Sequence, residues 1–283
     1  MFALAMTVLT LAAPDASCLR LEPGDGGSPV IQARINDQGP FGFVLDTASS
    51  ATTLDASRIA LLRLPRDGAP EQGQGMGGAF QVDLYRIAAF EAGPVHKRDF
   101  VVPEIKPPAF ESHDIAGLAG IDLFDDALAV WAPTTACVAV QPSGQVQDGW
   151  TPIQTDWQRA WRILLPIRIG DVSGWALLDT GAQHTTLNPA FAAALRLKMD
   201  ALPSGGQISG VDGAALSLRQ AQVRNVQVGR WRWPAAAIKV GDLRVFDRLG
   251  ASDQPLAILG VDWLGDKGFA IDYGAQKVWQ TSD

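Results

Sequence analysis

The sequence predicts an all-β protein built from two similar lobes. Its 283 residues include 29 Gly and 18 Pro, a composition that favours short strands and turns over long helices. An apolar run followed by Asp-Thr and then by Thr-Thr-Leu occurs twice, with Asp46 and Asp179 at equivalent positions 133 residues apart. A second repeated stretch aligns Gly120 with Gly260 at a separation of 140 residues. One structural unit is therefore present twice.

The domain boundaries follow from this repeat. We expect an N-terminal lobe at 18–140 that carries Asp46 and a C-terminal lobe at 161–283 that carries Asp179. The segment 141–160 is polar and contains Pro and Gly, so we interpret it as a linker. Each lobe is long enough to enclose a core of its own.

Local patterns predict the elements of both lobes in order. Apolar runs bounded by turn residues predict strands at 30–35, 41–45, 80–90 and 98–102. Helices are expected at 56–64, after the capping residue Asp55, and at 189–199, where Asn188 is the cap and Pro189 the first helical residue. Both helices follow a Thr-Thr-Leu segment, as the repeat requires.

The N-terminus resembles an export signal. Residues 2–13 are apolar, too few to span a bilayer but sufficient for the apolar part of a signal in 1–17. We therefore expect export to the periplasm or secretion, without stable membrane insertion. A cytoplasmic location is the alternative if this segment is not a signal.

The two cysteines and the net charge limit the chemistry. Cys18 and Cys137 flank the first lobe; if its end strands are adjacent they can form a disulfide, and otherwise they are buried thiols. Two cysteines cannot build a four-ligand zinc site, and we expect no metal. A net charge of −7 lacks the basic surface that nucleic acid requires.

Two equivalent carboxylates indicate acid–base chemistry. If a pseudo-two-fold axis brings Asp46 and Asp179 together, like charges that close share one proton, so one carboxyl acts as an acid and the other as a base. Such a pair can activate water and hydrolyse a peptide bond without a metal or cofactor. One chain supplies both groups, so we expect a monomer with an internal pseudo-dimer acting on an extended peptide.

The neighbouring residues gain roles from this hypothesis. Thr47 and Thr180 are expected to bond across the lobes, and Gly181 to let backbone N–H groups approach a carboxylate. Gly73–Gly78 has the spacing of a dinucleotide-binding loop, but no strand precedes it and no helix follows, so we interpret it as a mobile hairpin tip. The expected tip residues that close over a substrate are Gly75, Met76, Gly77 and Gly78 in one lobe and Gln207, Ile208, Ser209 and Gly210 in the other.

These motifs resemble those of the aspartic proteases, closer to the retropepsin kind than to pepsin. Asp179-Thr180-Gly181-Ala182 matches the family's Asp-Thr-Gly-Ala, and Asp46-Thr47-Ala48-Ser49 is a near match. The downstream Leu118-Ala119-Gly120 and Ile258-Leu259-Gly260 also match, and the resemblance extends from about Val30 to Gln280. It implies two fused retropepsin-like β-barrel lobes, arranged as in pepsin, with the active-site cleft between them and Asp46 and Asp179 as catalytic residues.

The first motif departs from the family at one position. Ala48 replaces the usual Gly, and a left-handed φ there would cost on the order of 1 kcal/mol. This departure motivates the alternative of a peptide-binding module that has kept the cleft but cleaves weakly or not at all. Ser49 is able to bond Asp46, whereas its counterpart Ala182 has no hydroxyl, so we expect the two carboxyls to differ.

Overall fold

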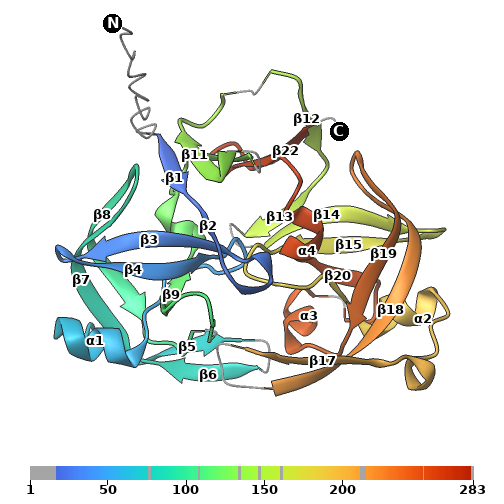
Figure 1. The fold of residues 1–283 in the computed structure, drawn as a ribbon, viewed down its shortest axis with the longest axis horizontal. Coiled ribbons are helices and arrows are strands. Elements are labelled where there is room, and N and C mark those ends of the chain that lie inside the picture. Colours follow the sequence, from blue (N-terminus) through green and yellow to red (C-terminus); the bar gives the residue numbers. More distant parts are fainter. Residues whose placement is uncertain are drawn as a thin grey trace, which may run out of the picture.

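The computed structural model describes residues 17–75, 78–107, 109–132, 135–145, 148–159, 162–210, 215–250 and 252–281. Strands dominate these ranges and form two lobes, each with one of the Asp-Thr motifs (Figure 1). The predicted all-β, two-lobe fold is therefore confirmed. No helix within these ranges is long and apolar enough to cross a membrane. The predicted export segment lies outside them apart from Ser17.

The N-terminal lobe contains one large sheet and one separate hairpin. The sheet consists of β2 (Glu22–Pro23), β3 (Pro29–Ile35), β4 (Gln38–Leu45), β7 (Leu84–Ala92), β8 (Val95–Pro103) and β9 (Ile115–Ala119). Its main order is β8-β7-β3-β4-β9, and β2 pairs with β3. The hairpin pairs β5 (Glu71–Gln74) with β6 (Ala79–Val82).

The C-terminal lobe is a barrel with additional strands. Its strands are β13 (Asp156–Arg159), β14 (Arg162–Ile169), β15 (Val172–Leu178), β16 (Thr186–Leu187), β17 (Ser204–Ser209), β18 (Ala215–Val228), β19 (Trp231–Val240) and β20 (Leu256–Leu259). They follow the order β13-β14-β15-β20-β16-β19-β18-β17. An additional pairing of β14 with β18 closes the barrel.

A third sheet joins the two halves of the chain. It contains β1 (Cys18–Arg20), β10 (Leu128–Ala132), β11 (Cys137–Gln141), β12 (Trp150–Ile153), β21 (Phe269–Asp272) and β22 (Lys277–Thr281). The order is β1-β11-β10-β21-β22-β12, so β10 from the first repeat pairs with β21 from the second. The expected linker 141–160 contributes β12 to this sheet and β13 to the barrel. A disulfide links Cys18 to Cys137 at the outer pair of strands.

Short helices connect the strands. They are the 3-10 helices η1 (Asp25–Gly27), η2 (Ile121–Leu123) and η4 (Met199–Ala201) and the α-helices α1 (Ala56–Leu62), α2 (Pro189–Ala194), α3 (Arg244–Arg248) and α4 (Val261–Leu264). Asp55 and Asn188 cap α1 and α2 through their side chains, as their sequence positions predict. Both helices are shorter than predicted, because Arg63 and Arg196 adopt left-handed conformations just beyond them.

The strand expected at 80–90 is divided in two. β6 ends at Val82 and β7 begins at Leu84, and the carbonyl of the intervening Asp83 accepts a bond from the Glu104 N–H. The start of the Gly73–Gly78 motif, where no strand was expected, belongs to β5.

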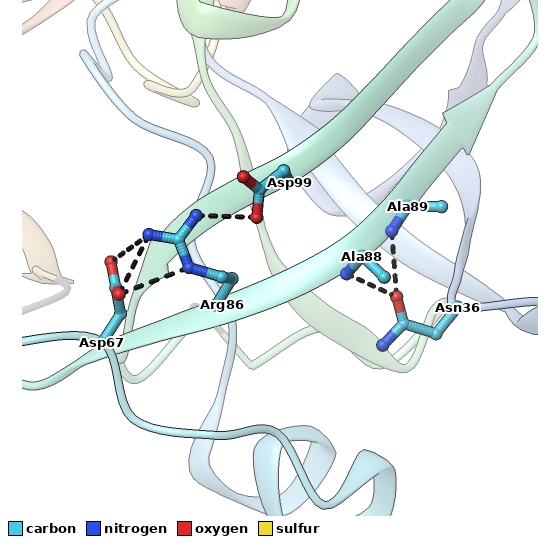
Figure 2. Close-up of polar contacts among 6 residues, drawn as sticks. All are labelled: Asn36, Asp67, Arg86, Ala88, Ala89 and Asp99. Atoms are coloured by element: carbon cyan, nitrogen blue, oxygen red, sulfur yellow. Dashed lines mark hydrogen bonds and ion pairs between the residues drawn. The ribbon is translucent and has the colours of Figure 1, made fainter.

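Polar side chains tie β7 to its surroundings (Figure 2). Arg86 bonds Asp67 on one side and Asp99 on the other, and Asn36 accepts bonds from the N–H groups of Ala88 and Ala89.

Candidate active site

The two motif aspartates occupy equivalent positions at the ends of buried strands. Asp46 follows β4 and Asp179 follows β15, and each strand pairs in parallel with a neighbour, β9 or β20. The N–H of Asp46 donates to Ala119 O at 2.9 Å, and that of Asp179 donates to Leu259 O at 3.2 Å. Both aspartates are thus fixed at the carboxyl ends of strands in the lobe cores.

Two threonines join the motif loops across the lobes. The N–H of Thr47 donates to Thr180 Oγ1 at 3.1 Å, and the N–H of Thr180 donates to Thr47 Oγ1 at 3.0 Å. Each hydroxyl then donates to a carbonyl of the opposite lobe, Thr47 to Leu178 O at 2.9 Å and Thr180 to Leu45 O at 2.7 Å. Both threonines are 1% exposed, so these bonds are shielded from water and hold the aspartates in a common register.

Each aspartate carboxyl accepts hydrogen bonds from its own loop, and the carboxyl of Asp46 also lies against the opposite loop. Asp46 Oδ1 accepts from the Ala48 N–H at 2.8 Å, and Asp179 Oδ1 accepts from the N–H groups of Gly181 at 3.0 Å and Ala182 at 2.9 Å. A Cβ added to Gly181 would lie 2.5 Å from Asp46 Cγ. The absence of a side chain at Gly181 therefore makes room for the carboxyl of the other lobe.

Burial raises the pKa of both carboxyls, and the charge of Asp46 raises the pKa of Asp179 further. The pKa of Asp46 is raised to about 6, chiefly by loss of solvation, although backbone N–H groups of Ala48 and Ser49 oppose the shift. The pKa of Asp179 is raised well above its ordinary value by burial and then by the charge of Asp46. The hydrogen bond between the carboxyls lowers the pKa of Asp46 and raises that of Asp179. The two carboxyls therefore share one proton as a coupled pair.

A second symmetric pair of aspartates supports the motif loops. Asp122 accepts from the N–H and hydroxyl of Thr52, both at 2.7 Å. Asp262 accepts from the N–H and hydroxyl of Thr185 at 2.8 and 2.7 Å. Neither aspartate was predicted to have a role, although both stand two residues after the repeated Gly120 and Gly260. That repeated spacing is the signal that could have revealed them.

The structure changes the expectations for Ser49 and Ala48. The Ser49 hydroxyl donates to Ala51 O at 2.8 Å, so it does not supply the expected side-chain bond to Asp46. Ala48 is absent from the described non-glycine residues with positive φ, and it packs beside Ala182 against an apolar cluster. The backbone strain that motivated the binding-module alternative is therefore not present.

Those predicted tip residues that the structure describes lie on or next to two hairpins, at the end of the molecule opposite the shared sheet (Figure 1). The Gly75 N–H donates to Gly78 O at 2.8 Å at the end of the β5–β6 hairpin, while Met76 and Gly77 lie outside the described residues. Gln207, Ile208 and Ser209 belong to the paired strand β17 rather than to a tip, and Gly210 follows it. The β17–β18 tip itself, 211–214, is likewise outside the description.

Equivalent apolar clusters lie between the motif strands and these hairpins. The N-lobe cluster is Val30, Val44, Val82, Ile105, Ile115 and Leu118, with Phe80, Leu84 and Phe110 against it. The C-lobe cluster is Leu164, Leu177, Leu218, Leu243, Phe246, Leu249, Leu256 and Ile258, with Ala48, Ala182 and Ile208 among the residues against it. Each cluster thus connects a strand that carries a motif aspartate to a hairpin.

The threonine exchange leads to a stability prediction. Thr180→Val leaves the Thr47 N–H and the Leu45 carbonyl buried without these partners, so the free energy of unfolding should fall by about 1–3 kcal/mol. Thr151→Val, at a half-buried position of β12, is the control and should change it by less than about 0.5 kcal/mol. Urea unfolding monitored by tryptophan fluorescence measures both; equal losses would contradict a special role for Thr180.

Comparison with known proteins agrees with this geometry. The family model described as aspartyl protease matches residues 31–123 and again residues 165–263. Each match contains one motif aspartate, as expected for two fused retropepsin-like lobes. No curated protein matches the chain. The two matches span more than half of the chain, which therefore belongs to the aspartyl protease family.

Proposed function

We propose that the protein is an aspartic endopeptidase that hydrolyses peptide bonds with water activated by Asp46 and Asp179. The observation that carries this proposal is the junction of the motif loops, where the carboxyl of Asp46 lies against Gly181 of the other lobe. Both aspartates keep partial solvent exposure, so water can reach them. The raised pKa values supply one ionised and one protonated carboxyl near neutral pH.

The proposed reaction begins with Asp46 ionised and Asp179 protonated. Asp46 takes a proton from water as the water oxygen attacks the peptide carbonyl, and Asp179 gives its proton to the carbonyl oxygen. In the tetrahedral intermediate the carboxyls have exchanged protonation states. Asp46 then protonates the leaving nitrogen while Asp179 recovers a proton from a hydroxyl of the intermediate. The C–N bond breaks, a carboxylic acid and an amine leave, and the starting dyad is restored.

The surrounding structure supports an extended peptide as the substrate. The β5–β6 and β17–β18 hairpins provide strand edges near the motif loops, to which an extended chain can hydrogen-bond. The partly buried apolar side chains that pack against the N-lobe and C-lobe clusters, such as Phe80 and Ile208, are available to contact an apolar side chain of the peptide. One chain supplies both aspartates, so the proposed active form is a monomer.

The proposed location is the periplasm or the extracellular space. The Cys18–Cys137 disulfide is of the kind that persists in oxidising compartments. The mass of the protein recovered from the exported fraction tests this proposal. Protein that still begins at residue 1 and is found only in the cytoplasmic fraction would contradict it.

A digest of a peptide library across a pH series tests the proposed activity. Cleavage should increase as the pH rises through about 6, where Asp46 ionises, and decrease at a higher pH, where Asp179 loses the shared proton. A hydroxyl-containing transition-state analogue of the peptide should inhibit. A folded protein that binds the analogue but cleaves no peptide at any pH would instead be a binding module.

A further inference from the structure

Arg162 is a buried cation without a counter-charge in the described structure. It is 9% exposed at the start of β14, and one nitrogen, Nη2, donates to Leu249 O just beyond α3. Its Nε–H is buried and has no hydrogen-bond partner. None of the ion pairs between described residues includes Arg162. A buried guanidinium in this state lacks compensation for its lost hydration.

Continuing the strand register sets Arg162 level with the motif aspartate of its lobe. Leu164 pairs with Leu177 in the antiparallel β14–β15 ladder, so continuing the same register sets Arg162 opposite Asp179. In the N-terminal lobe Val30 pairs with Val44, and the same step sets Ser28 opposite Asp46. Arg162 and Ser28 therefore hold equivalent positions in the two lobes, but only the C-terminal lobe has a charge there.

The surroundings of Arg162 connect it to the C-lobe cluster. Alternation along β14 puts Arg162 on the same face of the strand as Leu164, a member of that cluster. Leu249, whose carbonyl holds Arg162, is another member. The cluster also contacts Ala48 and Ala182 of the motif loops. Arg162 thus borders an apolar surface that begins at the dyad.

The dyad does not serve as the counter-ion. No ion pair between described residues joins Arg162 to Asp46 or Asp179, and its hydrogen bond goes to Leu249 O. A guanidinium has five N–H donors in a planar fork that matches a carboxylate. The missing partner is therefore an anion of this shape from outside the described chain.

We propose that Arg162 binds a carboxylate of the peptide substrate, at a subsite on the C-terminal-lobe side of the scissile bond. This inference rests on the proposed peptidase function. The carboxylate is supplied by a Glu or Asp side chain; the free C-terminus of a peptide has the same chemistry and is distinguished below. Because Ser28 is neutral, the preference is confined to one side of the scissile bond. The net charge of −7 repels acidic peptides in general, so a preference at one position must come from a local contact.

The test uses peptide pairs that differ by Glu or Gln at a single position, with free and with amidated C-termini. For the wild type, kcat/KM for the Glu peptide should exceed that for the Gln peptide by roughly tenfold to a hundredfold at one position. Amidation should leave this ratio in place; loss of the preference on amidation would identify the C-terminus as the ligand. A wild-type ratio near one at every position, with free and amidated termini alike, would overturn the proposal.

Substitutions of Arg162 test whether its side chain causes the preference for Glu over Gln. Arg162→Gln should bring the Glu-to-Gln ratio close to one, and Arg162→Lys should give an intermediate ratio because an ammonium keeps the charge without the planar fork. Arg244→Gln alters an exposed arginine of α3 and should retain the wild-type ratio. An undiminished Glu-to-Gln ratio in a folded Arg162→Gln variant would refute the assignment. If Arg162→Gln does not fold, the Arg162→Lys variant is used instead, and a ratio equal to that of the wild type would refute the assignment.

A binding measurement distinguishes failure of the carboxylate subsite from failure of the proposed peptidase function. If the wild type cleaves none of the peptides, the proposed peptidase function fails, and the affinities of the same labelled pairs are measured by fluorescence polarisation. Tighter binding of the Glu peptide that is lost in Arg162→Gln would retain the carboxylate subsite. Equal binding of both peptides would reject it.

Discussion

Asp179→Asn should abolish peptide cleavage while making the fold more stable at neutral pH. An amide cannot donate and recover the shared proton, so kcat should fall on the order of 100- to 10,000-fold. Loss of activity with gain of stability is the result expected for a group that is costly to bury but needed for the reaction. A merely structural Asp179 would show both quantities falling together.

The sign of the stability effect follows from the raised pKa. A carboxyl whose pKa is higher in the folded than in the unfolded chain stabilises at low pH, and this contribution is lost as pH rises from the ordinary 3.8 towards the folded value. Because its folded pKa is raised well above 3.8, the folded wild type holds a proton on the dyad at pH values where the unfolded chain has lost it. The advantage of Asp179→Asn should therefore grow by about 1.4 kcal/mol per pH unit and vanish near pH 4.

Urea unfolding between pH 4 and 8, with cleavage assays on the same samples, measures this prediction. Asp200→Asn changes an exposed aspartate of η4 and is the matched control, expected to keep both activity and pH dependence. Retained cleavage by Asp179→Asn would exclude the dyad as the catalyst. Parallel stability curves for variant and wild type would show that Asp179 is ionised in the folded protein.

Gly181→Ala should lower kcat nearly as much as Asp179→Asn does, although it removes no functional group. The new Cβ would lie 2.5 Å from Asp46 Cγ and 2.6 Å from Asp46 Oδ2, so the carboxyl or the loop must move. A shift of about 1 Å in a reacting group costs on the order of 100-fold in rate. The effect should appear in kcat, since peptide binding by the hairpins does not involve Gly181.

Ala48 provides the matched control for this substitution. It is the counterpart of Gly181 in the other motif, and its methyl group is accommodated against the C-lobe cluster. Ala48→Gly should retain cleavage and lose only about 0.5–1 kcal/mol of stability through greater backbone freedom. If Gly181→Ala and Ala48→Gly have equal activity, crowding at Asp46 is not what Gly181 prevents.

The repeat made the dyad loops predictable, because each copy contains its strand, aspartate, threonine and helix cap within a short stretch. Asp55 and Asn188 cap helices where their positions predict, since capping depends on residues two or three apart. The near-identity of the copies also suggested the exchange between Thr47 and Thr180. No single motif would have done so, because the bonded atoms are 133 residues apart.

Features that depend on distant pairing could not be read from the sequence. The strand β12 appeared to be linker because its few residues include Pro152, and only its pairing with β22 makes it part of a sheet. Asp122 stabilises a loop through Thr52, 70 residues earlier in the chain. Ser49 was expected to bond Asp46, but the nearby carbonyl of Ala51 takes its hydroxyl, a competition that residue types alone do not decide.

Carboxyl 13C NMR titration tests the sharing of one proton most directly, with signals assigned by their loss in Asp46→Asn and Asp179→Asn. We predict a first ionisation near pH 6, a second at clearly higher pH, and a changed Asp46 titration when Asp179 is replaced. Two independent titrations near the ordinary value of 3.8, each unaffected by removal of the other carboxyl, would contradict the account.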